Sequence, residues 1–113
     1  MILCSPHNPV GRVWTRAELQ NVGDICLKHG VITVSDEIHG DFVWGNNFQT
    51  VFASLGEQYE QNCVICTAPS KTFNIAGLQV SNIFIPNKNL RRRFRKQVAA
   101  AGYSQVNTFL STM

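Results

Sequence analysis

The order of apolar and polar stretches along the chain predicts alternating strands and helices. Met1–Cys4 is a short apolar stretch, and Val31–Ser35 is β-branched and almost continuously apolar, as strands buried in a parallel sheet are. Cys63–Thr67 and Gln79–Ile85 are also predicted as strands, and Glu57–Glu60 as a short helix. Because helical segments separate strands, the pattern indicates an α/β fold with a mostly parallel sheet and flanking helices.

Capping residues mark the two longer helices. Thr15 is followed three residues later by Glu18, which is the pattern of a capping box, and Gly30 is placed to end this helix. Asn87 is placed to cap a last helix that runs from Leu90 to about Ala101. The predicted apolar face of the first helix consists of residues at helical spacing, Leu19, Val22, Ile25 and Cys26.

The composition is that of an ordinary soluble globular protein. Of 113 residues, 44% are hydrophobic and 15% are charged, and this length suits at most one small domain. The sequence has no run of 18 apolar residues, which predicts no membrane span. The N-terminus lacks the basic and apolar regions of a signal peptide. We therefore expect a cytoplasmic protein with no membrane partner.

The net charge of +3 rests heavily on one segment, Leu90–Lys96, with the sequence LRRRFRK. A nucleic-acid-binding patch is one interpretation of such a segment. No aromatic platform or recognition motif accompanies these arginines, so we expect the solvated face of a helix and no nucleic-acid partner.

The sequence contains four cysteines, Cys4, Cys26, Cys63 and Cys66. The spacing from Cys63 to Cys66 is also found in zinc knuckles and redox motifs. This pair lies in a predicted strand, however, where positions three apart point to opposite faces. No second cysteine pair follows, so we expect four buried, reduced thiols and no metal site.

Polar clusters follow three predicted strands, at Asn8-Pro9, Asp36–His39 and Ser70-Lys71. Ligands of open α/β sheets bind beyond the carboxyl ends of the strands. A lysine there can form a Schiff base with an aldehyde cofactor. An aspartate can pair with a protonated pyridine nitrogen, so that the ring accepts electrons from a carbanion beside the imine. Asparagine and histidine can donate hydrogen bonds to the phenolic oxygen of the ring.

Each of these residues alone has a simpler interpretation. Lys71 alone is typical of a solvated turn, and Asp36 alone can cap the helix that follows it. Asn8-Pro9 is common turn chemistry, and His39 alone is more often a structural residue. Their order and spacing therefore carry the prediction.

The three clusters lie in the segments Ser5–Gly11 (SPHNPVG), Ser35–His39 (SDEIH) and Ala68–Leu78 (APSKTFNIAGL). Asn8 precedes Asp36 by 28 residues, and Asp36 precedes Lys71 by 35 residues. In residues, order and spacing, these segments closely resemble three motifs of the class I/II aminotransferase superfamily, whose members use pyridoxal 5'-phosphate (PLP).

The resemblance implies a PLP-dependent enzyme of fold type I and assigns roles to four residues. Lys71 would hold PLP and then remove the α-proton of an amino-acid substrate, while Asp36 would keep the pyridine nitrogen protonated. Asn8 and His39 would contact the phenolic oxygen of the ring. Family members are several times longer, so we expect residues 1–113 to be the central part of the PLP-binding large domain, truncated at both ends.

Two expectations concern the chain as a piece of a larger molecule. The full-length protein is expected to be a homodimer. The isolated chain, which ends in an apparent helix at Phe109–Met113, is expected to be inactive and marginally stable.

Two positions depart from the motifs of the family. Ala68 stands where many members have a serine that contacts the cofactor phosphate, and Gln79 stands where many have an arginine. The resemblance then leaves Thr67, Ser70 or groups outside this chain to bind the phosphate.

Within the superfamily, Asp36–His39 and Ala68–Asn74 look most like the MalY/PatB-type cystathionine β-lyases, also called cysteine C–S lyases. Many aminotransferases carry tyrosine where His39 stands. The resemblance therefore implies β-elimination of cystathionine or a cysteine conjugate to a thiol, pyruvate and ammonia. An aminotransferase acting on amino acids, and a non-catalytic fragment or regulatory relative, remain the alternatives.

Overall fold

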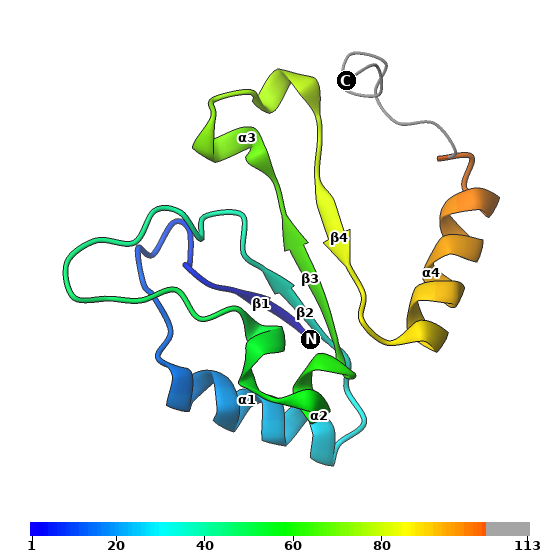
Figure 1. The fold of residues 1–113 in the computed structure, drawn as a ribbon, viewed down its shortest axis with the longest axis horizontal. Helices are drawn as coiled ribbons and strands as arrows, with labels where there is room; N and C mark the ends of the chain where they lie inside the picture. Colours follow the sequence, from blue (N-terminus) through cyan, green and yellow to red (C-terminus); the bar gives the residue numbers. More distant parts are fainter. Residues whose placement is uncertain (104–113) are drawn as a thin grey trace.

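The computed structural model describes residues 1–103, which form a four-stranded sheet with helices beside it (Figure 1). The strand order is β1-β2-β3-β4, in which the first three strands are parallel and β4 is antiparallel to β3. The sheet is therefore mostly parallel, as predicted. The helix expected at Phe109–Met113 lies outside the described residues. The strands are β1 (Ile2–Cys4), β2 (Thr33–Asp36), β3 (Cys63–Thr67) and β4 (Asn82–Phe84).

Helical segments connect the strands and follow the last one. A long helix, α1, connects β1 to β2, and two short ones, η1 and α2, connect β2 to β3. The segments α3 and η2 connect β3 to β4, and α4 follows β4. The α-helices are α1 (Arg16–Lys28), α2 (Glu57–Glu60), α3 (Pro69–Thr72) and α4 (Lys88–Ala100), and the 3-10 helices are η1 (Phe52–Leu55) and η2 (Ala76–Leu78).

The predicted capping box of α1 is confirmed. The hydroxyl oxygen of Thr15 accepts a hydrogen bond from the backbone N–H of Glu18 at 3.3 Å. In return, the Glu18 carboxylate accepts the backbone N–H of Thr15 at 2.9 Å. Two residues beyond the end of α1, Gly30 has a φ of 62°, a left-handed conformation that glycine adopts without a steric penalty. Local sequence signals therefore fix both ends of this helix.

The packed side of α1 differs from the predicted apolar face at Gly23 and Ile25. Leu19, Gly23 and Cys26 are buried, and Val22 is half-buried. Ile25 is 61% exposed, so its assignment to the apolar face is wrong. At 3.6 residues per turn, Ile25 lies roughly a third of a turn away from the line through the three buried residues.

The core fills one face of the sheet, between the strands and α1, η1 and α2. Within the described residues, the opposite face is not covered to the same extent. Ile2 is 80% exposed, Val34 and Val64 are half-buried, and all three residues of β4 are exposed. Within the described residues, β1, β2 and β3 are therefore buried on one face and β4 on neither. The buried core consists of Leu3, Leu19, Phe52, Leu55, Tyr59, Cys63 and Ile65.

The last helix, α4, begins where its cap predicts. The Asn87 side-chain oxygen accepts hydrogen bonds from the N–H groups of Asn89 and Leu90, both at 3.0 Å. No residue of α4 is buried, and Figure 1 shows the helix beside β4, away from α1 and α2. The basic residues of α4 after Arg91 are exposed, so this segment is a solvated helix face, as predicted.

The cysteines are reduced, but only two of the four are buried as expected. Cys26 and Cys63 are buried, whereas Cys4 and Cys66 are half-buried. Cys63 and Cys66 lie on opposite faces of β3, as strand geometry predicts. Over residues 1–103, the side chains form no cluster of three or more metal-ligating groups. No helix in this range has the length and apolar character needed to span a membrane.

Candidate active site

The polar clusters meet because the parallel strands end in register. Cys4, Asp36 and Cys66 lie side by side in one row across β1, β2 and β3. One residue further on, Ser5 N–H donates to the Asp36 carbonyl at 3.0 Å, and Glu37 N–H donates to the Cys66 carbonyl at 2.8 Å. The segments that follow the strands therefore leave the sheet at the same edge.

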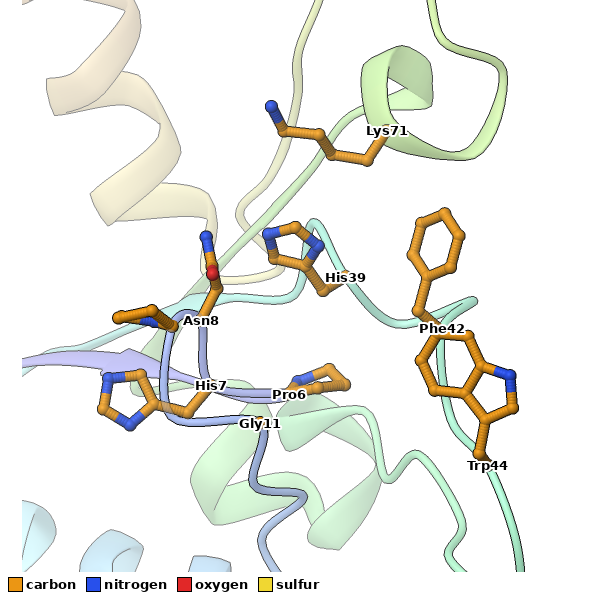
Figure 2. A pocket seen from close by; sticks show the side chains of 9 residues that line it. Pro6, His7, Asn8, Gly11, His39, Phe42, Trp44 and Lys71 are labelled. Atoms are coloured by element: carbon orange, nitrogen blue, oxygen red, sulfur yellow. The ribbon is translucent and has the colours of Figure 1, made fainter.

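A cavity of about 380 Å³ opens at this edge. Three predicted site residues line it, Asn8, His39 and Lys71. Figure 2 shows Lys71 reaching over the opening from α3, and Asn8 and His39 entering from the loops after β1 and β2. The structure thus brings together side chains that are 63 residues apart in the sequence. The other residues that line the cavity are Pro6, His7, Pro9, Gly11, Phe42 and Trp44.

Three other predicted residues lie outside this cavity lining. Asp36 is the last residue of β2, is half-buried, and accepts a hydrogen bond from Ile38 N–H at 3.2 Å. Thr67 ends β3, accepts a hydrogen bond from the Asn82 side chain at 3.3 Å, and lines a second cavity. Ser70 lies in α3 and lines neither of these two cavities.

A tight turn shapes the loop that carries Asn8. His7 N–H donates to the Arg12 carbonyl, and Gly11 N–H donates to the His7 carbonyl, both at 2.7 Å. Gly11 has a φ of 72°, which a residue with a Cβ rarely adopts. The asparagine is therefore held on a closed turn whose ends are hydrogen-bonded to each other.

The loop after β2 supplies an aromatic wall that the sequence analysis missed. The rings of His39 and Phe42 have centroids 6.3 Å apart, and those of Phe42 and Trp44 are 5.9 Å apart. Both aromatic residues line the cavity beside Lys71. The sequence did contain a signal for this wall: Phe42 and Trp44 closely follow the polar cluster Asp36–His39, in a segment that was predicted as a loop.

A buried carboxylate directly after β2, that of Glu37, was also missed. Glu37 is 6% exposed, and its oxygens accept hydrogen bonds from Ser35 Oγ and Phe52 N–H at 2.9 Å and from Gln49 Nε2 at 3.4 Å. Burial raises the pKa of Glu37, against the opposing effect of these hydrogen bonds. Gln49 Nε2 also donates to the Ser5 carbonyl at 3.2 Å, so this network joins the end of β2 to the start of the Asn8 loop.

The lysine stands on a single turn of helix that follows β3. Pro69 occupies the first turn of α3, where its missing N–H costs no hydrogen bond. Phe73 N–H donates to the Pro69 carbonyl and Ile75 N–H to the Ser70 carbonyl, both at 3.0 Å. The cavity therefore combines a primary amine that can attack a carbonyl with amide and imidazole groups that can donate hydrogen bonds.

The model of the family described as aminotransferase class I and II matches residues 1–112. Cystathionine beta-lyase PatB of Bacillus subtilis is 49% identical over 98% of this chain and 29% of its own length. The structure of cystalysin from Treponema denticola, described as containing a pyridoxal 5'-phosphate cofactor, matches with a TM-score of 0.90 and 48% identity. That match covers 96% of this chain and 27% of cystalysin.

A PLP-bound putative aminotransferase from Clostridium difficile 630 matches with a TM-score of 0.91 and 45% identity, over 96% of this chain and 28% of its own. This chain thus spans less than a third of the length of each of these relatives. The family match extends over the three strand-end motifs and over the sheet that brings them together. The chain therefore belongs to the class I and II aminotransferase family and has the α/β architecture of its fold type I members.

Proposed function

We propose that the protein containing these residues is a PLP-dependent lyase that eliminates a thiol from cystathionine or another cysteine conjugate, leaving pyruvate and ammonia. The meeting of Asn8, His39 and Lys71 in one cavity carries this proposal. The similarity to PatB and cystalysin supports it. We further propose that residues 1–113 form the central part of the PLP-binding large domain, and that the full-length protein is a cytoplasmic homodimer acting on a small amino-acid substrate.

The residues of the cavity fit this cofactor. A volume of about 380 Å³ lies within the usual range for small-molecule sites, roughly 300–1,000 Å³. Lys71 supplies the amine that an aldehyde requires, and the Asn8 amide and the His39 ring supply donors for an anionic oxygen. Asp36 lies at the end of the neighbouring strand, where its carboxylate would hold the proton of the pyridine nitrogen.

When bound, PLP withdraws electrons from the α-carbon of an amino acid joined to its aldehyde carbon, so that the α-proton becomes acidic and a β-substituent can leave. Lys71 Nζ would bind the cofactor covalently and, once displaced by the substrate amine, would accept the α-proton. Asn8 Nδ2 and a His39 ring N–H would donate to the phenolic oxygen. We assign the phosphate to the hydroxyl groups of Thr67 and Ser70, neither of which lines this cavity, or to groups outside this chain.

The aromatic wall suits a substrate with a thioether in its side chain. Phe42 and Trp44 line the cavity beside Lys71, and a thioether sulfur makes favourable contacts with aromatic rings. Cystathionine and other cysteine conjugates carry this thioether next to the β-carbon, where its sulfur could contact the two rings.

The alternative function is that of an aminotransferase, and the similarity to the putative aminotransferase from Clostridium difficile supports it. A substrate test separates the two functions. The full-length protein is incubated with cystathionine and no keto acid, and pyruvate and free thiol are measured. We expect both products over many turnovers. Activity that appears only when a keto acid is added would establish the aminotransferase. Bound cofactor without either activity would indicate a non-catalytic relative.

A second test addresses the lysine directly. Borohydride reduction of the full-length protein with PLP should fix the cofactor on a peptide that contains Lys71. The matched control is Lys28, which lies at the end of α1, so Lys28→Ala should leave the adduct unchanged and Lys71→Ala should abolish it. Mass spectrometry that locates the adduct on Lys28, Lys88 or Lys96 contradicts the proposal.

A further inference from the structure

The helical turn that carries Lys71 lies at the margin of the molecule. None of the residues of α3 and η2 is buried. Figure 1 shows α3 at the far end of β3, well away from α1 and α2. Ala68, at the N-cap position of α3, makes no side-chain capping bond. Packing therefore contributes little to the orientation of this turn.

A hydrogen bond ties the turn to the loop after β2. Thr72 Oγ1 donates to the carboxylate oxygen Oδ2 of Asp41 at 2.6 Å. A hydroxyl bonded to a carboxylate at this distance belongs to the short, charge-assisted class, which is roughly twice as strong as a bond between neutral groups. The bond joins segments 31 residues apart in the sequence.

The bonded pair lies next to the residues of the cavity. Thr72 immediately follows Lys71, and Asp41 is two residues after His39. Gly40 N–H donates to the Glu37 carbonyl, and Phe42 N–H donates to the His39 carbonyl, both at 2.9 Å. The carboxylate thus projects from a hydrogen-bonded turn whose position is fixed relative to the end of β2.

We propose that Asp41 is a positioning residue for Lys71, which acts through the hydroxyl of Thr72 and holds α3 at the angle that places the lysine amine over the cavity. This inference rests on the proposed function, because it assumes that Lys71 binds the cofactor. The four-residue helix α3 lies between β3 and η2, and no buried side chain of its own fixes its orientation. A displacement of about 1 Å in a reacting group can cost about a hundredfold in rate.

The test uses the full-length protein, freed of cofactor and then mixed with PLP. The quantity measured is the rate at which Lys71 becomes trappable by borohydride, followed by peptide mass spectrometry. Asp41→Ala and Thr72→Val should each slow this rate about tenfold. Because both changes break the same bond, the double variant should be no slower than either single one. Thr72→Ser keeps the hydroxyl and should restore the rate.

The matched control removes another hydrogen bond between a hydroxyl group and a carboxylate, far from Lys71. Tyr59 Oη donates to the Asp24 carboxylate at 2.7 Å, between α2 and α1. Asp24→Ala should lower the melting temperature and leave the trapping rate of Lys71 unchanged. Should Asp41→Ala fail to fold, the comparison of Thr72→Val with Thr72→Ser decides the question.

The possible results are distinguishable. Parent and variant proteins that trap the cofactor on Lys71 at equal rates overturn the role of Asp41 and leave the proposed function standing. Additive losses in the double variant also overturn it, since the two residues would then act separately. A parent protein that fixes no cofactor on Lys71 overturns the proposed function, and the role of Asp41 with it.

Discussion

The two halves of this chain differ in what holds them in place. The first half ends with β3 at Thr67. In it, β1, β2 and β3 pack one face against α1, η1 and α2, and the core residues lie between them. In the second half, none of the residues of α3, η2, β4 and α4 is buried. The candidate site spans the boundary, because Asn8 and His39 come from loops of the first half and Lys71 from the start of the second. The core cluster therefore lies in the first half alone, whereas the candidate site needs side chains from both halves.

The largest expected difference between the halves is the response to loss of a phenylalanine. Phe52 is 1% exposed and Phe84 is 55% exposed. Phe52→Ala should cost about 3–5 kcal/mol, which is most of the stability of a small domain. Phe84→Ala should change it by less than about 0.5 kcal/mol. Urea denaturation of the 113-residue chain measures both, and equal losses would contradict the comparison.

Replacing a glycine by alanine should lower the unfolding free energy in the first half but not in the second. A Cβ on Gly23 would lie 2.6 Å from Tyr59 Cδ1, whereas a Cβ on Gly77 would meet no atom within 4 Å. We expect Gly23→Ala to destabilise the chain by about 1–3 kcal/mol, because the packed helices must move apart. Gly77→Ala should be neutral or should stabilise it by less than about 1 kcal/mol, through the unfolded state. Thermal melts of the two variants give the signs directly.

A smaller effect concerns pH and the buried carboxylate of the first half. Burial raises the pKa of Glu37 above its ordinary value of 4.5, so the folded chain holds this proton more tightly than the unfolded chain does. This contribution to stability is fully present below about pH 4.5 and is lost as the pH rises through the raised pKa. Glu37→Gln should therefore gain stability relative to the parent as the pH is raised.

Unfolding free energies of the parent and the Glu37→Gln variant, measured from pH 4 to pH 8 (roughly the range over which a perturbed carboxyl titrates), test this expectation. The exposed residue Glu57 provides the matched change, since Glu57→Gln removes the same charge from the surface. If the difference in unfolding free energy between the parent and Glu37→Gln does not change with pH, the pKa of Glu37 is the same in the folded and the unfolded chain, and the expectation is wrong.

The smallest expected effect compares the two faces of β3. Burial raises the pKa of the Cys63 thiol to about 11, and this side chain is 0% exposed. Burial also raises the pKa of Cys66, but its side chain lies half-buried on the opposite face. Because the thiolate is the reactive form, iodoacetamide at neutral pH should modify Cys66 several-fold faster than Cys63. In denaturant the two rates should become similar.

Much of the fold could be predicted from the sequence, because its signals are local. The capping box at Thr15 depends on a residue three positions away, and the cap at Asn87 depends on N–H groups two and three positions away. Three of the predicted strands were found close to their expected bounds. The fourth, expected at Gln79–Ile85, shrinks to β4, because Gln79 adopts a left-handed conformation with a φ of 51° at the end of η2.

The candidate site divides in the same way. By itself, the sequence determined the identity and order of Asn8, His39 and Lys71 and placed each of them after a strand. Only the tertiary structure decided that these three share a cavity whose lining excludes Asp36, and that Asp41 is bonded to the turn of Lys71. Caps and strand patterns are encoded within a few residues, whereas a cavity wall or a bond across 31 positions exists only after the sheet has aligned its strand ends.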